Sequence, residues 1–187
     1  MNKITTENKG FITLGEKVMV SDPCYGLGTW CQGVLNNVLS GKYECVMERS
    51  DEGDWGNRVS AIEVTHIDYK GKFMCLQCEN IDIGVDSGQA GIFDYEYYAK
   101  YHTDATERDH VDDDWYDMVC DKTYTDYFDG NTIDNLGFVS SSGYGDGGYC
   151  CWVAKNEDDK IICIRVEFIT EDEEDDDYDE EDEYENI

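Results

Sequence analysis

Three short motifs hold the residue types from which this chain could build a reactive or ligand-binding site. They are DPCY at residues 22–25, VDSG at residues 85–88 and GYGDGGY at residues 143–149. The carboxylates of Asp22, Asp86 and Asp146 could together bind a cation, because Ca²⁺ and Mg²⁺ prefer oxygen ligands. However, no D-x-D-x-D-G loop of EF-hand type is present, and acids this far apart in sequence are weak evidence for a metal site. We therefore expect no metal and no cofactor.

Cys24 is a candidate nucleophile, because it stands beside the turn that Pro23 fixes, and a histidine would have to serve as its base. The three histidines are His66, His102 and His110. No protease signature surrounds Cys24, and His66 shares a strand face with apolar residues. We favour a packing role for each of these side chains, because buried cysteines are mostly inert. Cys75 and Cys78 have C-x-x-C spacing, but an odd offset in a strand points their thiols to opposite faces, so structural zinc is not expected.

The glycines of the third motif have a structural interpretation of their own. Glycine supplies positive φ, and we expect it at Gly145 or Gly147, while Asp146 can bond its neighbours' amides in an Asx turn. The alternative is a nest of backbone amides that holds an anion. The candidate binding residues of the three motifs are Asp22, Cys24, Tyr25, Asp86, Ser87, Gly145, Asp146 and Gly147.

Acidic residues dominate the composition, with 44 Asp and Glu against 14 Lys and Arg and a net charge of −30. Residues 171–187 hold 13 of these acids and no Lys or Arg, so the first 170 residues keep a net charge of −17. Self-repulsion predicts a disordered tail, which either aids solubility or presents a charge density like that of DNA to a basic groove. The tail residues expected to contact a partner are Glu171, Asp172, Glu173, Glu174, Asp175, Asp176, Asp177, Tyr178 and Tyr184.

This charge excludes some functions and favours others. An acidic protein repels phosphate backbones and anionic membranes, so we expect neither direct nucleic-acid binding nor membrane binding, and a basic protein as the partner. No apolar run is long enough to span a bilayer, and the first residues contain no signal-peptide core. Nine cysteines, an odd number, without a signal peptide indicate a reducing cytoplasm rather than a disulfide framework.

The elements that position the motifs are mostly strands. Alternating patterns predict strands at residues 11–14, 18–21, 42–49, 59–69 and 72–78, and two short strands within residues 82–94 on either side of a bend at residues 86–88. The strands at 11–14 and 18–21 are expected to form one hairpin, and those at 59–69 and 72–78 another. A helical stripe over residues 29–40, with Thr29 and Gln32 at capping-box spacing, predicts a helix. Asp94 and residues 112–114 can cap two further short helices. The hairpin within residues 149–168 is the expected centre of the sheet, with its first strand covered on both faces.

These observations predict one α+β domain over residues 1–170, mainly antiparallel sheet of sandwich or half-barrel type with two or three short helices, followed by the tail at 171–187. The DPCY, VDSG and GYGDGGY motifs resemble those of a family of uncharacterised bacterial and phage proteins, domain of unknown function 4241-like. The resemblance implies a β-rich fold and a bacterial or phage source, and it implies no activity.

We expect a non-catalytic binding protein rather than an enzyme. It would be encoded by a phage, act in the host cytoplasm, and bind and block a basic protein that handles nucleic acid or serves in defence, by mimicking nucleic acid. One alternative is a small-ligand or metal-dependent hydrolase with its site around the three motif turns. Another is a structural or virion-associated module.

Overall fold

The computed structural model describes residues 3–30, 32–69, 78–102, 113–124 and 129–170. Its strands form two antiparallel sheets, as the sequence predicts. The six-stranded sheet has the order β1 (Ile4–Leu14), β4 (Gly41–Asp51), β5 (Asn57–His66), β11 (Ile161–Glu167), β10 (Gly147–Lys155), β6 (Cys78–Val85). The five-stranded sheet has the order β3 (Gly33–Asn36), β2 (Lys17–Ser21), β7 (Gln89–Asp94), β9 (Gly137–Ser141), β8 (Gly130–Ile133).

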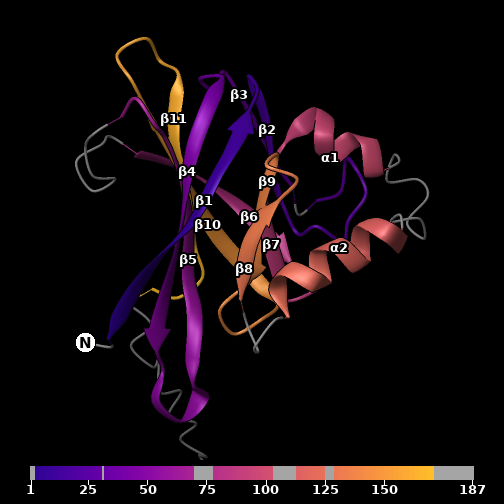
Figure 1. The fold of residues 1–187 in the computed structure, drawn as a ribbon, viewed down its shortest axis with the longest axis vertical. Coiled ribbons are helices and arrows are strands. Elements are labelled where there is room, and N and C mark those ends of the chain that lie inside the picture. Colours follow the sequence, from indigo (N-terminus) through magenta and orange to yellow (C-terminus); the bar gives the residue numbers. More distant parts are fainter. Residues whose placement is uncertain (1–2, 31, 70–77, 103–112, 125–128, 171–187) are drawn as a thin grey trace, which may run out of the picture.

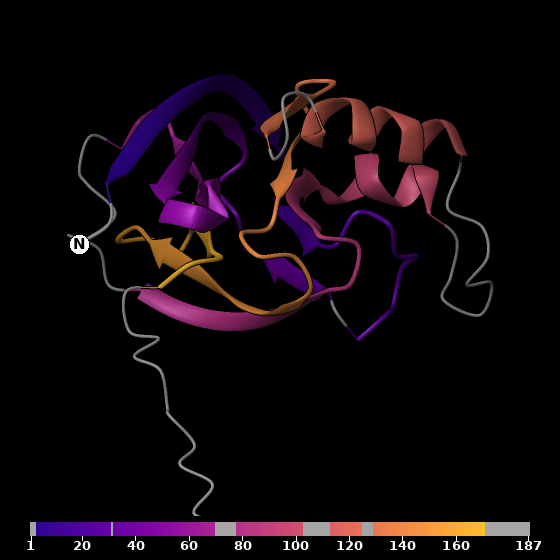
Figure 2. The ribbon, with the colours of Figure 1, turned by 90° about the horizontal axis from the view of Figure 1, so that it is seen from below.

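The layers are six-stranded sheet, five-stranded sheet and helices, in that order (Figures 1 and 2). Side chains from both sheets form the larger core, in which Tyr43, Met47, Ile92 and Phe138 are fully buried. A second core lies between the five-stranded sheet and the helices, around Trp115. The sheets remain open at their edges, so the fold is a sandwich with a helical layer and not a barrel.

The helices α1 (Tyr95–Tyr101) and α2 (Asp113–Thr123) confirm the two predicted after Asp94 and at residues 112–114. Asp94 accepts a hydrogen bond from the Tyr97 backbone N–H at 3.1 Å, which caps the N-terminus of α1. Its other carboxylate oxygen accepts from the Gly15 N–H at 2.9 Å, so the same side chain also fixes the link between β1 and β2. None of the helices within the described ranges is long and apolar enough to cross a membrane.

The final hairpin occupies inner positions, as predicted: β11 lies between β5 and β10, and β10 lies between β11 and β6. One face of each strand is core, with Cys151 and Ile164 fully buried. The opposite face of β10 differs from the prediction, because Trp152 and Cys150 are only half-buried. The helices pack on the other sheet, so none of the described elements forms a further layer on this face of the six-stranded sheet (Figure 2).

Polar contacts stabilise this outer face in place of a packed layer. The Arg165 guanidinium bonds three carboxylates, those of Glu48 at 2.6 Å, Glu63 at 3.3 Å and Glu167 at 3.0 Å. Burial opposes the charge of Arg165, but the hydrogen bonds and charges of Glu48 and Glu167 raise the pKa of its guanidinium. The Trp152 indole N–H also donates to Glu167, at 2.7 Å. The outer face is therefore ordered and carries more negative than positive charge.

The helix predicted over residues 29–40 is wrong, because the structure places β3 there. The two residues at capping-box spacing close a loop instead: the Thr29 hydroxyl donates to the Gly26 carbonyl at 3.2 Å. The Gln32 side chain accepts from the Gly28 N–H and donates to the Gly26 carbonyl, both at 2.8 Å. Side chains used in this way cannot cap a helix.

Burial within β3 explains the false helical stripe. Val34 is exposed and Leu35 is buried, which is the alternation of a strand with one face in the core. Asn37 follows with φ of 64°, a left-handed residue that ends the strand in a turn. A side chain at Gly33 would lie 2.6 Å from Ile81 Cδ1 of β6, so the two sheets approach closely here and a larger residue would force the Ile81 side chain to move.

The hairpin predicted from residues 11–14 and 18–21 is also wrong. Both strands exist, but β1 pairs with β4 in one sheet and β2 pairs with β3 and β7 in the other. The short link at Gly15–Glu16 therefore carries the chain from sheet to sheet, which alternation of apolar residues does not distinguish from a hairpin. The strand predicted at residues 72–78, with its hairpin turn, falls almost wholly outside the described residues, as does the tail at 171–187.

Candidate functional site

The three motifs meet at one end of the sandwich, here called the motif end and made of residues 22–25, 86–88 and 143–148. The DPCY turn follows β2 of the five-stranded sheet. The DSG turn joins β6 to β7, and the GYGDGG bend joins β9 to β10. Both of these connections pass from one sheet to the other. The second and third motifs therefore turn the chain between the sheets, and the DPCY turn lies beside them.

Asp22 joins the first two motifs through its side chain. It is fully buried. One carboxylate oxygen accepts from the Cys24 N–H and the Ser87 hydroxyl, each at 2.8 Å. The other accepts from the backbone N–H groups of Asp86 at 2.9 Å and Ser87 at 2.8 Å. Four donors satisfy both oxygens, as a buried carboxylate requires.

The third motif is held to the second by its backbone. The Ser142 N–H donates to the Gly88 carbonyl at 3.0 Å. Gly145 has φ of 116°, which confirms the predicted positive φ, whereas Gly147 is an extended residue paired with Val85. The Tyr149 hydroxyl donates to the Gly145 carbonyl at 2.7 Å and so closes the bend. The glycine is needed here for conformation.

The helical layer fixes the DPCY turn from the other side. The Trp115 indole N–H donates to the Pro23 carbonyl at 2.8 Å, and His102 Nε2 lies 3.0 Å from the same oxygen. The Tyr98 hydroxyl donates to the Tyr25 carbonyl at 2.6 Å. Sequence reasoning missed these contacts, because a buried Trp or His gives no sign of which distant carbonyl it bonds.

Cys24 does not have the environment of a nucleophile. Burial is the main cause that raises the pKa of its thiol to about 12, and the nearby charge of Asp22 adds to it. The thiol is therefore protonated at neutral pH. His102 bonds Pro23, and His66 packs edge-on against Tyr43 in the six-stranded sheet, so neither forms a described hydrogen bond to Cys24. His110 lies outside the described residues.

A cation site gains no support from the geometry. Both oxygens of Asp22 already bond protein donors, and the Tyr25 hydroxyl donates to the Asp86 carboxylate. Asp146 is exposed. Within the described parts of the chain, no group of three or more His, Cys, Asp or Glu side chains could hold a metal ion. A hollow of about 520 Å³ does open on the outer face of the six-stranded sheet, between Phe11, Glu44 and Tyr69, but no motif residue lines it.

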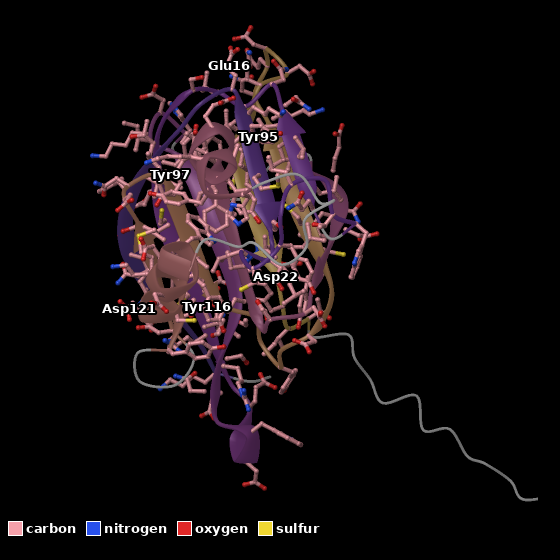
Figure 3. All side chains as sticks on the ribbon, turned by 90° about the vertical axis from the view of Figure 1, so that its right-hand side faces the viewer. Glu16, Asp22, Tyr95, Tyr97, Tyr116 and Asp121 are labelled. Atoms are coloured by element: carbon pink, nitrogen blue, oxygen red, sulfur yellow. The ribbon has the colours of Figure 1, made fainter. Side chains whose placement is uncertain are left out.

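α2 adds polar side chains next to Asp22 and Cys24. Figure 3, which faces the helices, shows Asp22 and Tyr116 in the same half of the molecule, with Glu16 at the opposite end. A hydrogen bond with Cys120 is the main cause that raises the pKa of Tyr116 to about 12, and the charge of Cys24 contributes. The Tyr116 phenol is therefore protonated at physiological pH and supplies contacts rather than acid–base chemistry.

The exposed part of the motif end is acidic and aromatic. The link between β4 and β5 (residues 51–57, here the β4–β5 tip) reaches it, where the Tyr144 hydroxyl donates to Glu52 Oε2 at 2.5 Å. Trp55 in the same link is 70% exposed. The backbone N–H groups of Phe168 and Ile169 donate to the Ser60 carbonyl, and a side chain at Gly143 would meet both residues. The last described residues therefore lie beside the third motif.

One comparison with known proteins finds a match. A family model described as a protein of unknown function, DUF4241, matches residues 79–166, which run from β6 to β11 and include the second and third motifs. The resemblance predicted from the motifs is confirmed over this range. No curated protein and no solved structure matches the chain.

Proposed function

We propose that this chain, which over residues 79–166 belongs to a family of proteins of unknown function, binds a basic protein and blocks the surface on which that protein receives nucleic acid. One observation carries the proposal: the motif end displays acidic and aromatic side chains beside residue 170, where the polyacidic segment 171–187 begins. The motif end of the body is thus acidic, and 13 further acids follow it in the sequence.

The chain's own bases do little to neutralise this surface, because several of them already bond acids elsewhere. Lys9 contacts Glu7 and Asp129 at 2.8 and 2.9 Å, and Arg49 bonds the same two carboxylates. The hydrogen bond from Lys9 is the main cause that lowers the pKa of Glu7. Arg165 is held among three carboxylates on the outer sheet face. The remaining negative charge produces a field that attracts cations and basic proteins.

Nucleic-acid mimicry follows from the density of this charge. Duplex DNA presents about one charge per 1.7 Å of its axis, and residues 171–187 place 13 acids within 17 positions. A basic groove that binds nucleic-acid phosphates would therefore experience a similar negative field from residues 171–187. We further propose that the protein is encoded by a phage, acts in the host cytoplasm and targets a host protein that handles nucleic acid or serves in defence.

The test uses the full chain immobilised as bait for bacterial lysate. The proposal expects one or a few basic nucleic-acid-binding proteins, released by about 0.5 M salt and by competing duplex DNA, because exposed charges are screened within about a Debye length. The control replaces the acids of residues 171–187 by Asn and Gln and keeps Tyr178 and Tyr184. It should slow association more than it speeds dissociation. Capture insensitive to salt and DNA would refute mimicry. In a parallel capture from phage-infected cells, binding of structural virion proteins would favour a virion-associated role.

A further inference from the structure

Two exposed aromatic side chains at the motif end face each other from separate strand connections. Trp55 comes from the β4–β5 tip and is 70% exposed, and Tyr144 comes from the GYGDGG bend and is 50% exposed. Their ring centroids lie 6.4 Å apart with planes at 84°. Tyr144 is held by its hydroxyl's bond to Glu52. Two ring surfaces of different orientation are thus presented to solvent at fixed positions.

This exposure serves no packing purpose among the residues that the structure describes. No residue of the short 3-10 helix Gly53–Trp55 is buried, so the indole contributes little to the core. Exposing a side chain of this size forfeits most of the free energy that its burial would supply. Trp, Tyr and Arg are the residues most enriched among those that dominate binding energy at protein interfaces. The pair has the composition of such a site.

The chain's own arginine shows which chemistry these rings accept. The Arg58 guanidinium carbon lies 5.9 Å from the centroid of the Tyr144 ring, within the range of a cation–π contact. Its Nε donates to the Trp55 carbonyl at 2.8 Å. The tip thus accommodates one arginine of its own, and the exposed surface left to an incoming guanidinium is mainly that of Trp55, which is 70% exposed.

The acidic side chains around Trp55 and Tyr144 favour a positively charged ligand. Asp51, Glu52 and Asp54 belong to the tip itself, and Asp146 follows Tyr144 by two residues. Arg58 is the only basic residue within residues 51–58 and 143–148. A cation is attracted here by both the carboxylates and the ring faces. Arginine suits the site better than lysine, because its planar group stacks on rings and bonds carboxylates through two N–H groups at once.

We propose that Trp55 and Tyr144 form a receptor for an arginine side chain of the basic partner, with Glu52 and its acidic neighbours bonding the guanidinium. This inference rests on the proposed function, since it names the side chain by which the partner is recognised. It also assigns a role to the β4–β5 tip, which none of the three motifs includes.

The experiment compares two labelled probes of equal charge, nona-arginine and nona-lysine peptides, titrated into the full chain at about 0.15 M salt and followed by fluorescence anisotropy. Residues 171–187 are the same in the wild type and in each variant, so the change in the ratio of the two affinities on replacing Trp55 isolates the contact with the rings. We expect the wild-type chain to prefer nona-arginine by about fivefold, equivalent to about 1 kcal/mol. The Trp55→Ala variant should lose most of this preference, and Trp55→Phe should keep part of it. Trp30→Ala is the matched control, since Trp30 is 73% exposed and has no described ring contact, and it should leave the ratio unchanged.

The outcomes separate the two proposals. If the wild-type chain binds neither peptide, the proposed function fails and the arginine receptor fails with it. If both peptides bind but the ratio is the same in Trp55→Ala and the wild type, the proposed function stands and the receptor is refuted. Thermal melts of each variant confirm that the fold is intact, which is expected because the replaced rings are exposed.

Discussion

Replacing Asp22 by Asn tests whether the motifs are held by a buried carboxylate. In one orientation the amide oxygen accepts from Asp86 and Ser87, and the amide NH₂ then faces the Cys24 N–H across a distance that is now 2.8 Å. In the other orientation the NH₂ faces the two N–H groups of the DSG turn. Either way at least one buried backbone donor loses its acceptor, and the remaining bonds lose the help of the charge.

The expected cost can be worked out from these contacts. A buried donor left without a partner costs about 1–3 kcal/mol, and bonds to a charged group are worth about 1.5–3 kcal/mol against about 1 kcal/mol for neutral ones. We therefore expect a loss of about 3–4 kcal/mol, a large part of the ~5–15 kcal/mol that a domain possesses. For a domain of this size that corresponds to roughly 6–16 °C in the thermal midpoint.

Urea unfolding at unchanged m-value, together with thermal melting, measures this loss. Asp146→Asn is the matched control, because Asp146 is exposed and should change stability by less than about 0.5 kcal/mol. A midpoint for Asp22→Asn within about 2 °C of the wild type would refute the structural role of the carboxylate. A saturable rise in the wild-type midpoint with Ca²⁺ or Mg²⁺ that Asp22→Asn abolishes would instead favour a cation site and the hydrolase alternative.

Three further predictions concern the backbone, the thiol and the tail. Gly145→Val should lower the free energy of unfolding, measured by urea denaturation, by more than about 1 kcal/mol, because Gly145 has φ of 116°. Gly148→Val is the control, since Gly148 has neither positive φ nor crowding around its Cα. Equal stabilities of the two variants would contradict the role given to positive φ. Iodoacetamide should alkylate Cys24 at pH 8 far more slowly than a model thiol in mass-spectrometric mapping, because burial raises its pKa to about 12 and the reactive thiolate forms only towards that pH. Rapid labelling would show that the turn opens. Ending the chain after Thr170 should leave the thermal midpoint within a few degrees, and loss of a cooperative melt would mean that the tail belongs to the domain.

The sequence predicts best where one strand face is core and the other is not. Tyr43, Cys45 and Met47 lie on one face of β4, with Glu44 and Glu48 on the other, and all three are buried as expected. Asp94 has the type and position of a helix cap, and it caps α1. These are local properties, in which a residue's type and its neighbours decide the structure.

Prediction from the sequence fails where it must assign a strand to one of the two sheets. The apolar residues of β1 and β2 alternate in the same way whether the strands pair with each other or lie in opposite layers. β3 is four residues long, and its Val34 and Leu35 fit a helical stripe as well as a strand. Only its pairing with β2 and its contact with β6 decide between them, and neither is local.

The geometry of the sheet crossings explains why the motifs look like a catalytic site in the sequence. A chain that turns sharply between two packed sheets needs glycine for positive φ and an acid whose carboxylate satisfies the exposed backbone N–H groups of the turn. Aspartate, serine and glycine therefore gather at such corners for the same reason that they gather at many active sites. Here Asp22, Ser87 and Gly145 are all used in this way, and their polar groups bond the protein itself. The exposed rings of Trp55 and Tyr144, which we propose receive an arginine, lie beside the corner that these residues build.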